Sequence, residues 1–331
     1  MARVGRRCRS GGCVSDRAEI VRVDDLVKDV RPGFGLRKKR ILEGISFRVR
    51  EREIFGFIGP NGAGKTTTLK VLMGLIRATS GQASILGHDV SEITFRRQIG
   101  FLPEQPYFYD YLTGREILRF YAKLSGVSQE SRERRVAELL ELVGLTAASN
   151  TRLRSYSKGM LQRIGVAQAL VHDPQVVFLD EPMSGLDPVG RKEVRDIILR
   201  LRDEGKTIFM NTHILSDVEM VCDRVAIIVS GRIRYEGAID EFLDAGEPEA
   251  DLVFANLPAE TAAQLEESFA ARLRGHGDRI ELRIAEKDSS AVLRLALDAG
   301  AVVISATPHR VSLESIFLST VNEADAEGDP Q

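Results

Sequence analysis

The spacing of apolar residues changes several times along the chain and predicts strands and helices in turn. Residues 19–50 alternate between apolar and polar positions as strands do, with a break at Pro32-Gly33. A short apolar run at residues 54–58 predicts a buried strand, and a glycine-rich loop follows it. Apolar residues then recur at helical spacing from Leu69 to Ile76, so we expect strand, loop and helix in direct succession.

A helical period dominates from about Thr113 to Leu145, where apolar residues recur every three or four positions. We expect a helical insertion there, over about residues 102–155. Further along, amphipathic helices alternate with apolar strands, in the order 161–171, 176–180, 191–202, 207–211 and 225–229. Such alternation indicates a parallel sheet that helices cover on both faces.

The last part of the chain is predicted to be a separate small domain. Residues 244–250 are small and polar, which is typical of a linker after the main domain at 19–243. The remaining pattern predicts a βαβ-type accessory domain over residues 251–321. Its expected strands are 252–257, 280–284 and 302–305, and its expected helices are 259–273 and 289–297.

Both ends of the chain differ in composition from the domains between them. The first eighteen residues are rich in Arg, Gly and Ser and lack the apolar stretch of a signal peptide. We expect residues 1–18 to be a disordered arm, or the product of a start codon placed too early. Residues 322–331 are expected to form a frayed acidic tail.

Composition and charge limit the classes of protein that the chain could represent. Its 331 residues, 43% of them hydrophobic, suffice for one large core and a smaller second domain. The net charge of -2 gives no general attraction to nucleic acid or membrane. The apolar runs are shorter than the roughly 20 residues of a transmembrane helix. The three cysteines suggest neither a disulfide framework nor a zinc site, which fits a reducing cytoplasmic setting.

The glycine-rich loop after the strand at 54–58 fits the pattern G-x-x-x-x-G-K-[ST] without a mismatch. Its glycines allow backbone N–H groups to surround phosphate oxygens, and the start of the next helix adds its positive end. Lys65 is expected to reach the β and γ phosphates of ATP, and the Thr66 hydroxyl is expected to bind Mg²⁺. The predicted nucleotide-binding residues of this loop are Gly59, Pro60, Asn61, Gly62, Ala63, Gly64, Lys65, Thr66 and Thr67.

Two carboxylates end the apolar strand that begins at Val176. Asp180 stands where a second contact to Mg²⁺, direct or through water, is needed. Glu181 can polarise the attacking water as general base. Paired acids at a strand end carry little information alone, but a phosphate loop upstream makes them a strong indication of an ATPase.

A third motif narrows the class of ATPase. The sequence YSKGM at residues 156–160 resembles the LSGGQ signature of ABC ATPases, and Gln-Arg and an Ala-rich helix follow it. Ser157 and Gly159 match the signature, and the other positions depart from it as they do in ABC-2-type exporter ATPases. The chemistry survives, because the Ser157 hydroxyl and the Gly159 N–H at a helix start can hold a γ-phosphate. Lys158 either adds charge there or faces solvent.

Two further positions resemble functional residues of the family. Residues 184–187 (SGLD) resemble the D-loop, so Asp187 is expected at the seam between two subunits. His213 follows the strand at 207–211 and resembles the switch histidine that contacts the γ-phosphate. A lone histidine is usually structural, but its position and neighbours favour the catalytic role here.

The resemblance leaves two positions open. The Q-loop glutamine of the family aligns with Glu104, so either Glu104 or Gln105 would contact Mg²⁺ and the attacking water. Val30 occupies the place of the aromatic residue that stacks on adenine. Phe34 or another residue of the same loop would then replace it.

The resemblance covers about residues 19–243 and implies an ATP-binding subunit of an ABC transporter. It implies an α/β fold: a P-loop NTPase core with a parallel sheet, an N-terminal antiparallel β part and a helical subdomain, beside the small C-terminal α+β domain. Two subunits, identical or different, would sandwich two ATP molecules, with each phosphate loop facing the partner's Ser157. Hydrolysis to ADP and phosphate would drive a separate transmembrane permease for export, at the cytoplasmic face of the cell membrane.

An aromatic cluster supports a permease as partner, and the net charge of -2 gives no reason to expect nucleic acid. In the family pattern the helical insertion and the loop from about Gln105 to Tyr111 meet the permease. This loop holds Tyr107, Phe108, Tyr109 and Tyr111, which fit an interface.

The alternative function is a soluble ABC ATPase in DNA repair or translation. Such chains usually carry a long coiled-coil insertion or two fused cassettes, and the sequence has neither pattern. A third class is a non-hydrolytic, ATP-gated binding module. Intact Lys65, Asp180, Glu181 and His213 argue against this class.

Overall fold

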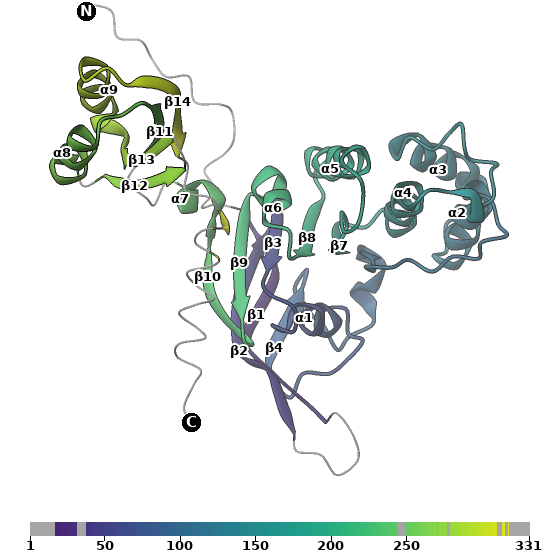
Figure 1. The fold of residues 1–331 in the computed structure, drawn as a ribbon. Coiled ribbons are helices and arrows are strands. Elements are labelled where there is room, and N and C mark those ends of the chain that lie inside the picture. The colour runs from purple at the N-terminus through teal and green to yellow at the C-terminus, as the bar shows by residue number, and fades with distance from the viewer. Residues whose placement is uncertain are drawn as a thin grey trace, which may run out of the picture. The chain divides into compact units, whose positions relative to one another are not determined.

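The computed structural model describes residues 17–31, 38–243, 249–269, 271–276, 279–309, 313–314 and 317. They form two compact units, the first of which ends at Gly237, while the second begins at Ala238 (Figure 1). Each unit has a hydrophobic core of its own. The two units are therefore described separately.

An antiparallel sheet begins the first unit. β1 (Glu19–Val30) pairs with β2 (Lys39–Arg50) on one side and with β4 (Ser80–Ile85) on the other, and both pairings are antiparallel. The short β5 (His88–Asp89) completes the order β2-β1-β4-β5. Every second side chain from Ile45 to Val49 in β2 is buried, which gives the alternation seen in the sequence. The predicted antiparallel β part is confirmed.

The core of this unit is a six-stranded sheet in the order β10-β9-β3-β8-β7-β6. Its strands are β3 (Ile54–Ile58), β6 (Ile99–Leu102), β7 (Val176–Asp180), β8 (Thr207–Thr212), β9 (Arg224–Val229) and β10 (Arg232–Ala238). The five neighbouring strands β9, β3, β8, β7 and β6 run parallel, so their carboxyl ends meet at one edge of the sheet. All side chains of β3, β7, β8 and β9 are buried, which explains their continuous apolar runs.

Aromatic side chains join the two sheets of the first unit. Phe47 of β2 packs against Phe55 and Phe57 of β3 and against Phe209 of β8, with 5.2 to 6.0 Å between ring centroids. All four rings are buried. Because these rings are large and tightly packed, they fix the antiparallel sheet on the core sheet and hold β3 and β8 in place.

Helices contact the core sheet and form the predicted insertion. α1, α4, α5 and α6 contact core strands, while α2 and α3, which lie in the predicted insertion, contact each other and α4. The helices of this unit are α1 (Lys65–Leu72), α2 (Gly114–Leu124), α3 (Gln129–Leu142), α4 (Lys158–Ala169), α5 (Pro188–Asp203) and α6 (Leu215–Val221), with short 3-10 turns at Thr94–Gln98 and Leu153–Ser155.

Local signals explain the ends of the insertion. Thr113 caps α2 and forms a reciprocal capping box with Glu116. Tyr156, just before α4, donates a hydrogen bond of 2.8 Å to the Ala148 carbonyl. A Cβ at Gly114 would overlap the Tyr156 hydroxyl, so the glycine permits this close approach. Tyr156 therefore ties the segment before α4 to the insertion.

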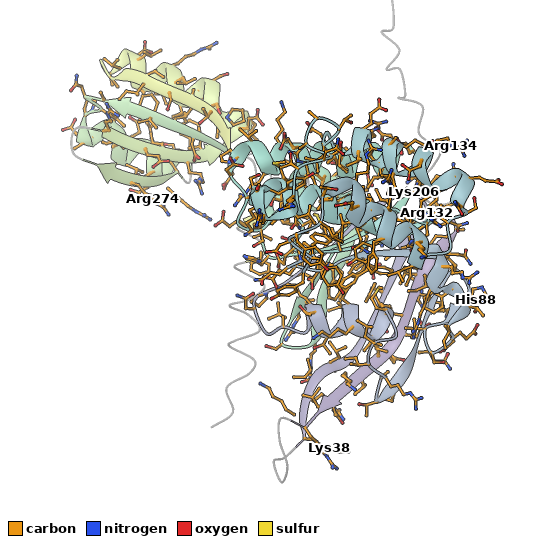
Figure 2. All side chains as sticks on the ribbon, turned by 90° about the vertical axis from the view of Figure 1, so that its right-hand side faces the viewer. Lys38, His88, Arg132, Arg134, Lys206 and Arg274 are labelled. Carbon is orange, nitrogen blue, oxygen red and sulfur yellow. The ribbon has the colours of Figure 1, made fainter. Side chains whose placement is uncertain are left out.

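The outer side of the insertion is charged, and Figure 2 shows two of its arginines on α3. Arg132 donates a hydrogen bond of 3.0 Å to the Val127 carbonyl. Arg134 lies 3.6 Å from Glu138, one turn along the same helix. Both arginines are therefore held by contacts to neighbouring groups, as is typical of charged side chains on a solvated helix face.

The second unit contains a four-stranded antiparallel sheet with the order β12-β13-β11-β14. This order, with one helix before β12 and another before β14, is the split βαβ arrangement of ferredoxin-like folds. Its elements are α7 (Ile239–Leu243), β11 (Glu249–Ala255), α8 (Ala259–Phe269), β12 (Arg272–His276), β13 (Arg279–Ala285), a 3-10 turn at Glu286–Asp288, α9 (Ser289–Asp298) and β14 (Val302–His309).

One sequence-based expectation is wrong in this unit. The helix expected over residues 259–273 ends at Phe269, and Leu273 lies in β12 instead. In this edge strand Arg272 and Arg274 flank Leu273, whose burial is only partial. A single apolar residue gives too weak an alternation to reveal a strand from the sequence.

Several expectations lie outside the described residues or remain predictions. Residues 1–16 of the expected arm, Phe34, residues 244–248 of the expected linker and the expected tail at 322–331 are not among the residues that the structure describes. The domain boundaries at 243 and 251 remain predictions. Within the described residues, no helix has both the length and the apolar character needed to cross a membrane.

We expect the two cores to lose stability independently. Phe254 is fully buried in the second unit, so Phe254→Ala should lower that unit's free energy of unfolding by about 3–5 kcal/mol. Calorimetry should then show one transition at lower temperature and the other unchanged. Phe209→Ala in the first core is the matched control and should shift the other transition. A single transition that both variants shift equally would contradict two independent cores.

Candidate functional site

The loop between β3 and α1 has a backbone that only glycine adopts readily. Gly62 and Gly64 have φ values of 83° and 112°, in the left-handed region. A Cβ at Gly64 would also lie 2.6 Å from Leu42, and one at Gly59 would overlap the Ile228 carbonyl oxygen. The Lys65 Nζ donates to the Gly59 carbonyl oxygen at 2.7 Å. The loop therefore curls around the buried ammonium group of its own lysine.

Acidic and polar side chains meet where β7 and β8 end side by side. Asn211 Nδ2 donates a hydrogen bond of 2.6 Å to Asp180 Oδ1. Thr212 Oγ1 donates one of 3.1 Å to Glu181 Oε2, and His213 Nδ1 lies 2.8 Å from Glu181 Oε1. Glu181 has a φ of 50°, an unusual value for a residue with a side chain. Parallel pairing thus brings both acids to the polar end of β8.

Sequence reasoning named the acids and His213 but gave Asn211 and Thr212 no role. Both are buried and lie at the end of β8, where the strand's other side chains are mostly apolar. A polar pair at the end of a buried apolar strand was the available signal, because buried polar groups need partners. Here the partners are the two carboxylates, which Asn211 and Thr212 hold in place.

Burial shifts the ionisation of the charged groups at this edge. Burial raises the pKa of the Asp180 carboxyl, and the nearby Glu181 and Glu104 raise it further, against the hydrogen bond from Asn211. Burial lowers the pKa of the Lys65 ammonium, while the same three acids oppose that shift. Excess negative charge therefore lies beside the loop, where a cation would be favourable.

A cleft of about 350 Å³ brings together residues from several of the predicted motifs. Ile41, which the sequence did not suggest, also contributes to its wall. The residues lining it are Ile41, Asn61, Gly62, Gly64, Lys65, Thr66, Thr67, Glu104, Glu181 and His213. The cleft is therefore lined by the phosphate loop and by residues from distant parts of the sequence.

Glu104 and Gln105 differ in position. Glu104 lines this cleft and also an adjoining groove of about 320 Å³, which Thr66 and Asp180 share. Gln105 lines only the groove, where its Oε1 accepts a hydrogen bond of 3.3 Å from the Tyr107 hydroxyl. Of these two residues, only Glu104 therefore lines the cleft beside the phosphate loop.

The signature residues lie elsewhere on the same unit. Ser157 caps α4 and accepts a hydrogen bond of 3.2 Å from the Met160 N–H. Asp187 caps α5 and accepts one of 2.8 Å from the Gly190 N–H. Ser157 and Asp187 are exposed, and neither these two residues nor Gly159 line the cleft of their own chain. The structure therefore brings together one part of the predicted site and keeps another part separate.

Comparison with known proteins gives consistent matches. Residues 42–184 match the family model described as ABC transporter. An uncharacterised ABC transporter ATP-binding protein of Synechocystis is 48% identical over 234 residues, 70% of this chain and 66% of that protein. YhcH of Bacillus subtilis, another such protein, is 36% identical over 300 residues, 88% and 94% of the two chains. A fluoroquinolones export ATP-binding protein of Mycobacterium tuberculosis is 44% identical over 195 residues, 58% and 63% of the two chains.

Solved structures agree with these matches. The ATP-binding subunit of an ABC transporter aligns with a TM-score of 0.59 and 33% identity, over 67% of this chain and 91% of that one. A dimeric ATP-binding cassette in a post-hydrolysis state, bound to ADP and Pi, aligns with a TM-score of 0.60 over 66% and 99% of the two chains. At 24% identity the second match is one of fold.

We expect Asp180→Asn to raise the unfolding temperature of the ligand-free protein at neutral pH. The folded-state pKa of Asp180 lies above its unfolded value, so the native state of the unsubstituted protein gains stability as pH falls through that raised pKa. The advantage of asparagine should therefore vanish below the unfolded value of about 3.9. The same substitution should abolish Mg²⁺-dependent hydrolysis.

Thermal unfolding between about pH 4 and about pH 8 measures this effect. Asp196→Asn, at an exposed position on α5, is the control and should change the unfolding temperature little at any pH. A lower unfolding temperature for Asp180→Asn at neutral pH would show that the carboxylate stabilises the ligand-free fold.

Proposed function

Because the chain belongs to the ATP-binding subunits of ABC transporters, which hydrolyse ATP to ADP and phosphate for transport, we propose that two such subunits close around two ATP molecules. Their closure and reopening would drive a separate transmembrane permease in the direction of export. The observation that carries the proposal is the convergence of Lys65, Glu181 and His213 on one cleft, while Ser157 lies outside it.

ATP is proposed to lie in this cleft with its phosphates on the loop at residues 59–67. The N–H groups of the loop and the positive end of α1 favour a phosphate, and Lys65 adds a full charge. On binding, the Lys65 ammonium would exchange its carbonyl contacts within the loop for phosphate oxygens. The stacking partner of adenine is proposed to be Phe34 or another residue of the same loop.

The oxygen donors beside the phosphate loop fit Mg²⁺. This ion prefers oxygen ligands and usually takes one or two carboxylates together with the phosphates of its substrate. Among the described residues there is no cluster of three His, Cys, Asp or Glu that would hold a metal alone. Thr66 and Asp180, with Glu104 or Gln105, would hold Mg²⁺ against the phosphates. The bound ion would neutralise charge on the transferred phosphoryl group.

Glu181 is proposed as the general base of hydrolysis. Its carboxylate would accept a proton from the attacking water as the water oxygen bonds to the γ-phosphorus. The bond between that phosphorus and the β–γ bridging oxygen breaks at the same time, and ADP leaves with the bridging oxygen. Thr212 and His213 both contact Glu181 and would fix its orientation. His213 is partly exposed, so its Nε2 remains available to the γ-phosphate.

Each ATP is proposed to be shared between two subunits. Ser157, Gly159 and Asp187 do not line the cleft of their own chain, so they would complete the site of the partner. Support comes from the cassette of the same fold that was solved as a dimer with ADP and Pi. The two subunits are either identical or different.

A permease partner is supported by exposed aromatic residues beside the groove. Tyr107 is 87% exposed, and Tyr109 and Tyr111 are more than half exposed. Tyr109 also packs edge-on against Phe120 of α2, with 5.9 Å between ring centroids. Large exposed aromatics are typical of an interface that is covered in the assembled state. The chain would thus be held at the cytoplasmic face of the membrane by its permease.

Export is proposed as the direction because one relative is named a fluoroquinolones export ATP-binding protein. Another relative, LnrL of Bacillus subtilis, is named a linearmycin resistance ATP-binding protein, and export of the compound is one way to give resistance.

We expect purification of the tagged chain from membranes to recover a polytopic membrane protein in a constant ratio to the ATPase. Tyr107→Ala with Tyr109→Ala should weaken that recovery without altering ATP binding. Recovery of the ATPase with ribosomes or DNA and without a membrane protein would overturn the transport proposal.

We expect Glu181→Gln to bind ATP normally and to lose hydrolysis by about 10²–10⁴-fold, since glutamine keeps the shape but cannot accept the proton. ATP should then trap a stable dimer, which sedimentation or light scattering measures. Glu204→Gln, an exposed position after α5, is the matched control and should hydrolyse ATP normally. Near-normal hydrolysis by Glu181→Gln would assign the base to another group, with Glu104 and His213 the first to test.

We expect mixed subunits to reveal shared sites. Ser157→Arg should bind ATP as a monomer, since the phosphate loop is unchanged, but should neither dimerise with ATP nor hydrolyse it. Lys65→Ala should lose most of its ATP affinity. A mixture should recover hydrolysis, because one of its two sites combines an intact loop with an intact signature.

Partial recovery is the expected outcome if the two sites are coupled. Either variant mixed with more of itself is the control and should stay inactive. A Ser157→Arg protein that hydrolyses ATP at the normal rate as a dilute monomer would refute shared sites.

A further inference from the structure

Asp217 is a buried carboxylate that none of the sequence motifs includes. It lies on α6, shortly after His213, and only 2% of its surface is exposed. Among the described residues, its buried Oδ2 atom has no hydrogen-bond partner. Most buried polar atoms have such a partner, and a buried carboxylate that lacks one is costly. Packing alone therefore does not explain an aspartate at this position.

Two arginines of α5 lie close to this carboxylate, where α5 and α6 are in contact (Figure 1). Arg191 and Arg195 are one turn apart and so share one face of α5. Arg195 donates a hydrogen bond of 2.9 Å to the sulfur of Met220, which is one turn after Asp217 on α6. Burial raises the pKa of the Asp217 carboxyl, and the positive charges of Arg191 and Arg195 oppose that shift. Both arginines are therefore near enough to Asp217 to be attracted by it.

Arg191 also holds the loop that carries Asp187. Its Nε donates a hydrogen bond of 3.2 Å to the Leu186 carbonyl oxygen. Leu186 is buried and directly precedes Asp187, the cap of α5. The position of this loop thus depends on the direction of the Arg191 side chain, which Asp217 attracts toward α6.

The helix that carries Asp217 is fixed on the core sheet. Val218, the next residue, packs so closely on β3 that a Cβ at Gly56 would lie 3.2 Å from its side chain. The Asp217 N–H donates a hydrogen bond of 3.2 Å to the Ile214 carbonyl, which ties Asp217 to the start of the same helix. Asp217 is therefore a fixed charge, and Arg191 is the side chain that adjusts to it.

We propose that Asp217 is a positioning residue that orients Arg191, and through Arg191 holds the loop at residues 184–187 in place for the seam between two subunits. The inference rests on the shared-site function proposed above and adds two residues to it. Asp187 would take the position needed at the partner only while Asp217 attracts Arg191. The carboxylate would thus be retained for the position of the loop, although its burial is costly.

The same contact links the groups of hydrolysis to the subunit seam. His213 lies 2.8 Å from Glu181 and stands just before α6, whereas Asp187 caps α5. Asp217 and Arg191 face each other between these two helices, and neither residue lines the cleft. A change at Asp217 should therefore weaken closure of the dimer and leave binding of ATP to the monomer intact.

The test uses ATP-driven dimerisation in a Glu181→Gln background, where hydrolysis does not consume the nucleotide. Asp217→Asn keeps the shape of the side chain and removes its charge. It should leave the ATP affinity of the monomer unchanged and raise the protein concentration for half-maximal dimerisation by about tenfold or more. Asp203→Asn, which removes the same charge from the exposed last residue of α5, is the matched control and should behave as the parent.

A double-mutant cycle tests whether Asp217 acts through Arg191. Arg191→Gln should weaken dimerisation by a similar factor, and the double variant should be no weaker than either single variant. Arg195→Gln should have a smaller effect, because its hydrogen bond goes to Met220 and not to the loop. Additive effects at Asp217 and Arg191 would overturn the proposal. An effect of Arg195→Gln as large as that of Arg191→Gln would also overturn it, because the loop contact would then not be what matters.

Thermal unfolding separates a positioning role from a structural one. Burial holds the pKa of Asp217 above its unfolded value, so the charged carboxylate costs stability at neutral pH. Asp217→Asn should therefore leave the ligand-free unfolding temperature unchanged or raise it, even though it weakens dimerisation. A clear fall would mean that the carboxylate supports the fold, and the proposal would be wrong.

The outcomes also separate this proposal from the function on which it rests. Dimerisation of the Asp217→Asn variant equal to that of the parent would overturn the role of Asp217, while the shared-site function would stand. If the Glu181→Gln parent itself fails to dimerise with ATP, the shared-site function fails and this proposal fails with it.

Discussion

Burial of opposite charges at the carboxyl edge of the core sheet is the constraint on which the rest of the first unit depends. Lys65, Asp180 and Glu181 are buried there, and isolated charges in such a place would be costly. The protein offsets the cost with the carbonyl groups of the phosphate loop and with Asn211 and Thr212. Burial still raises the pKa of Asp180 and lowers that of Lys65. The edge therefore keeps a part of this electrostatic cost, which a bound phosphate and cation would reduce.

The pairing of the core strands sets the positions of these charged groups relative to one another. Parallel pairing of β7 with β8 places Asp180 opposite Asn211, and pairing of β3 with β8 brings the phosphate loop to the same edge. Phe47 locks the antiparallel sheet onto β3 and β8 through ring contacts. A shift of one strand would separate the acids from their partners, so tight apolar packing below the edge preserves the chemistry above it.

The arrangement of the site agrees with the proposal that two subunits share each nucleotide. The phosphate loop, the acids and His213 meet at a common cleft, whereas Ser157 and Asp187 cap neighbouring helices on an exposed surface. That surface carries two helix N-termini and Lys158, together with the carboxylate of Asp187. The N-termini of both helices would favour the phosphates of a nucleotide carried by a second copy. Assembly and nucleotide binding would thus reinforce each other through electrostatics.

The sequence by itself determined the local chemistry, because each motif is a contiguous run whose function can be read from its residues. The phosphate loop needs glycines before Lys65, and Asp180 and Glu181 end an apolar strand, so their class and family could be predicted. The parallel core and the antiparallel β part could be predicted from apolar periodicity.

Only tertiary structure decided which distant residues meet. It brought Asn211 and Thr212 to the acids, placed Glu104 rather than Gln105 in the cleft, and laid Lys158 over Gly185. It also showed a strand at Leu273, where one half-buried residue left the pattern too weak to read. Such contacts depend on strand order and helix packing, which no single segment encodes.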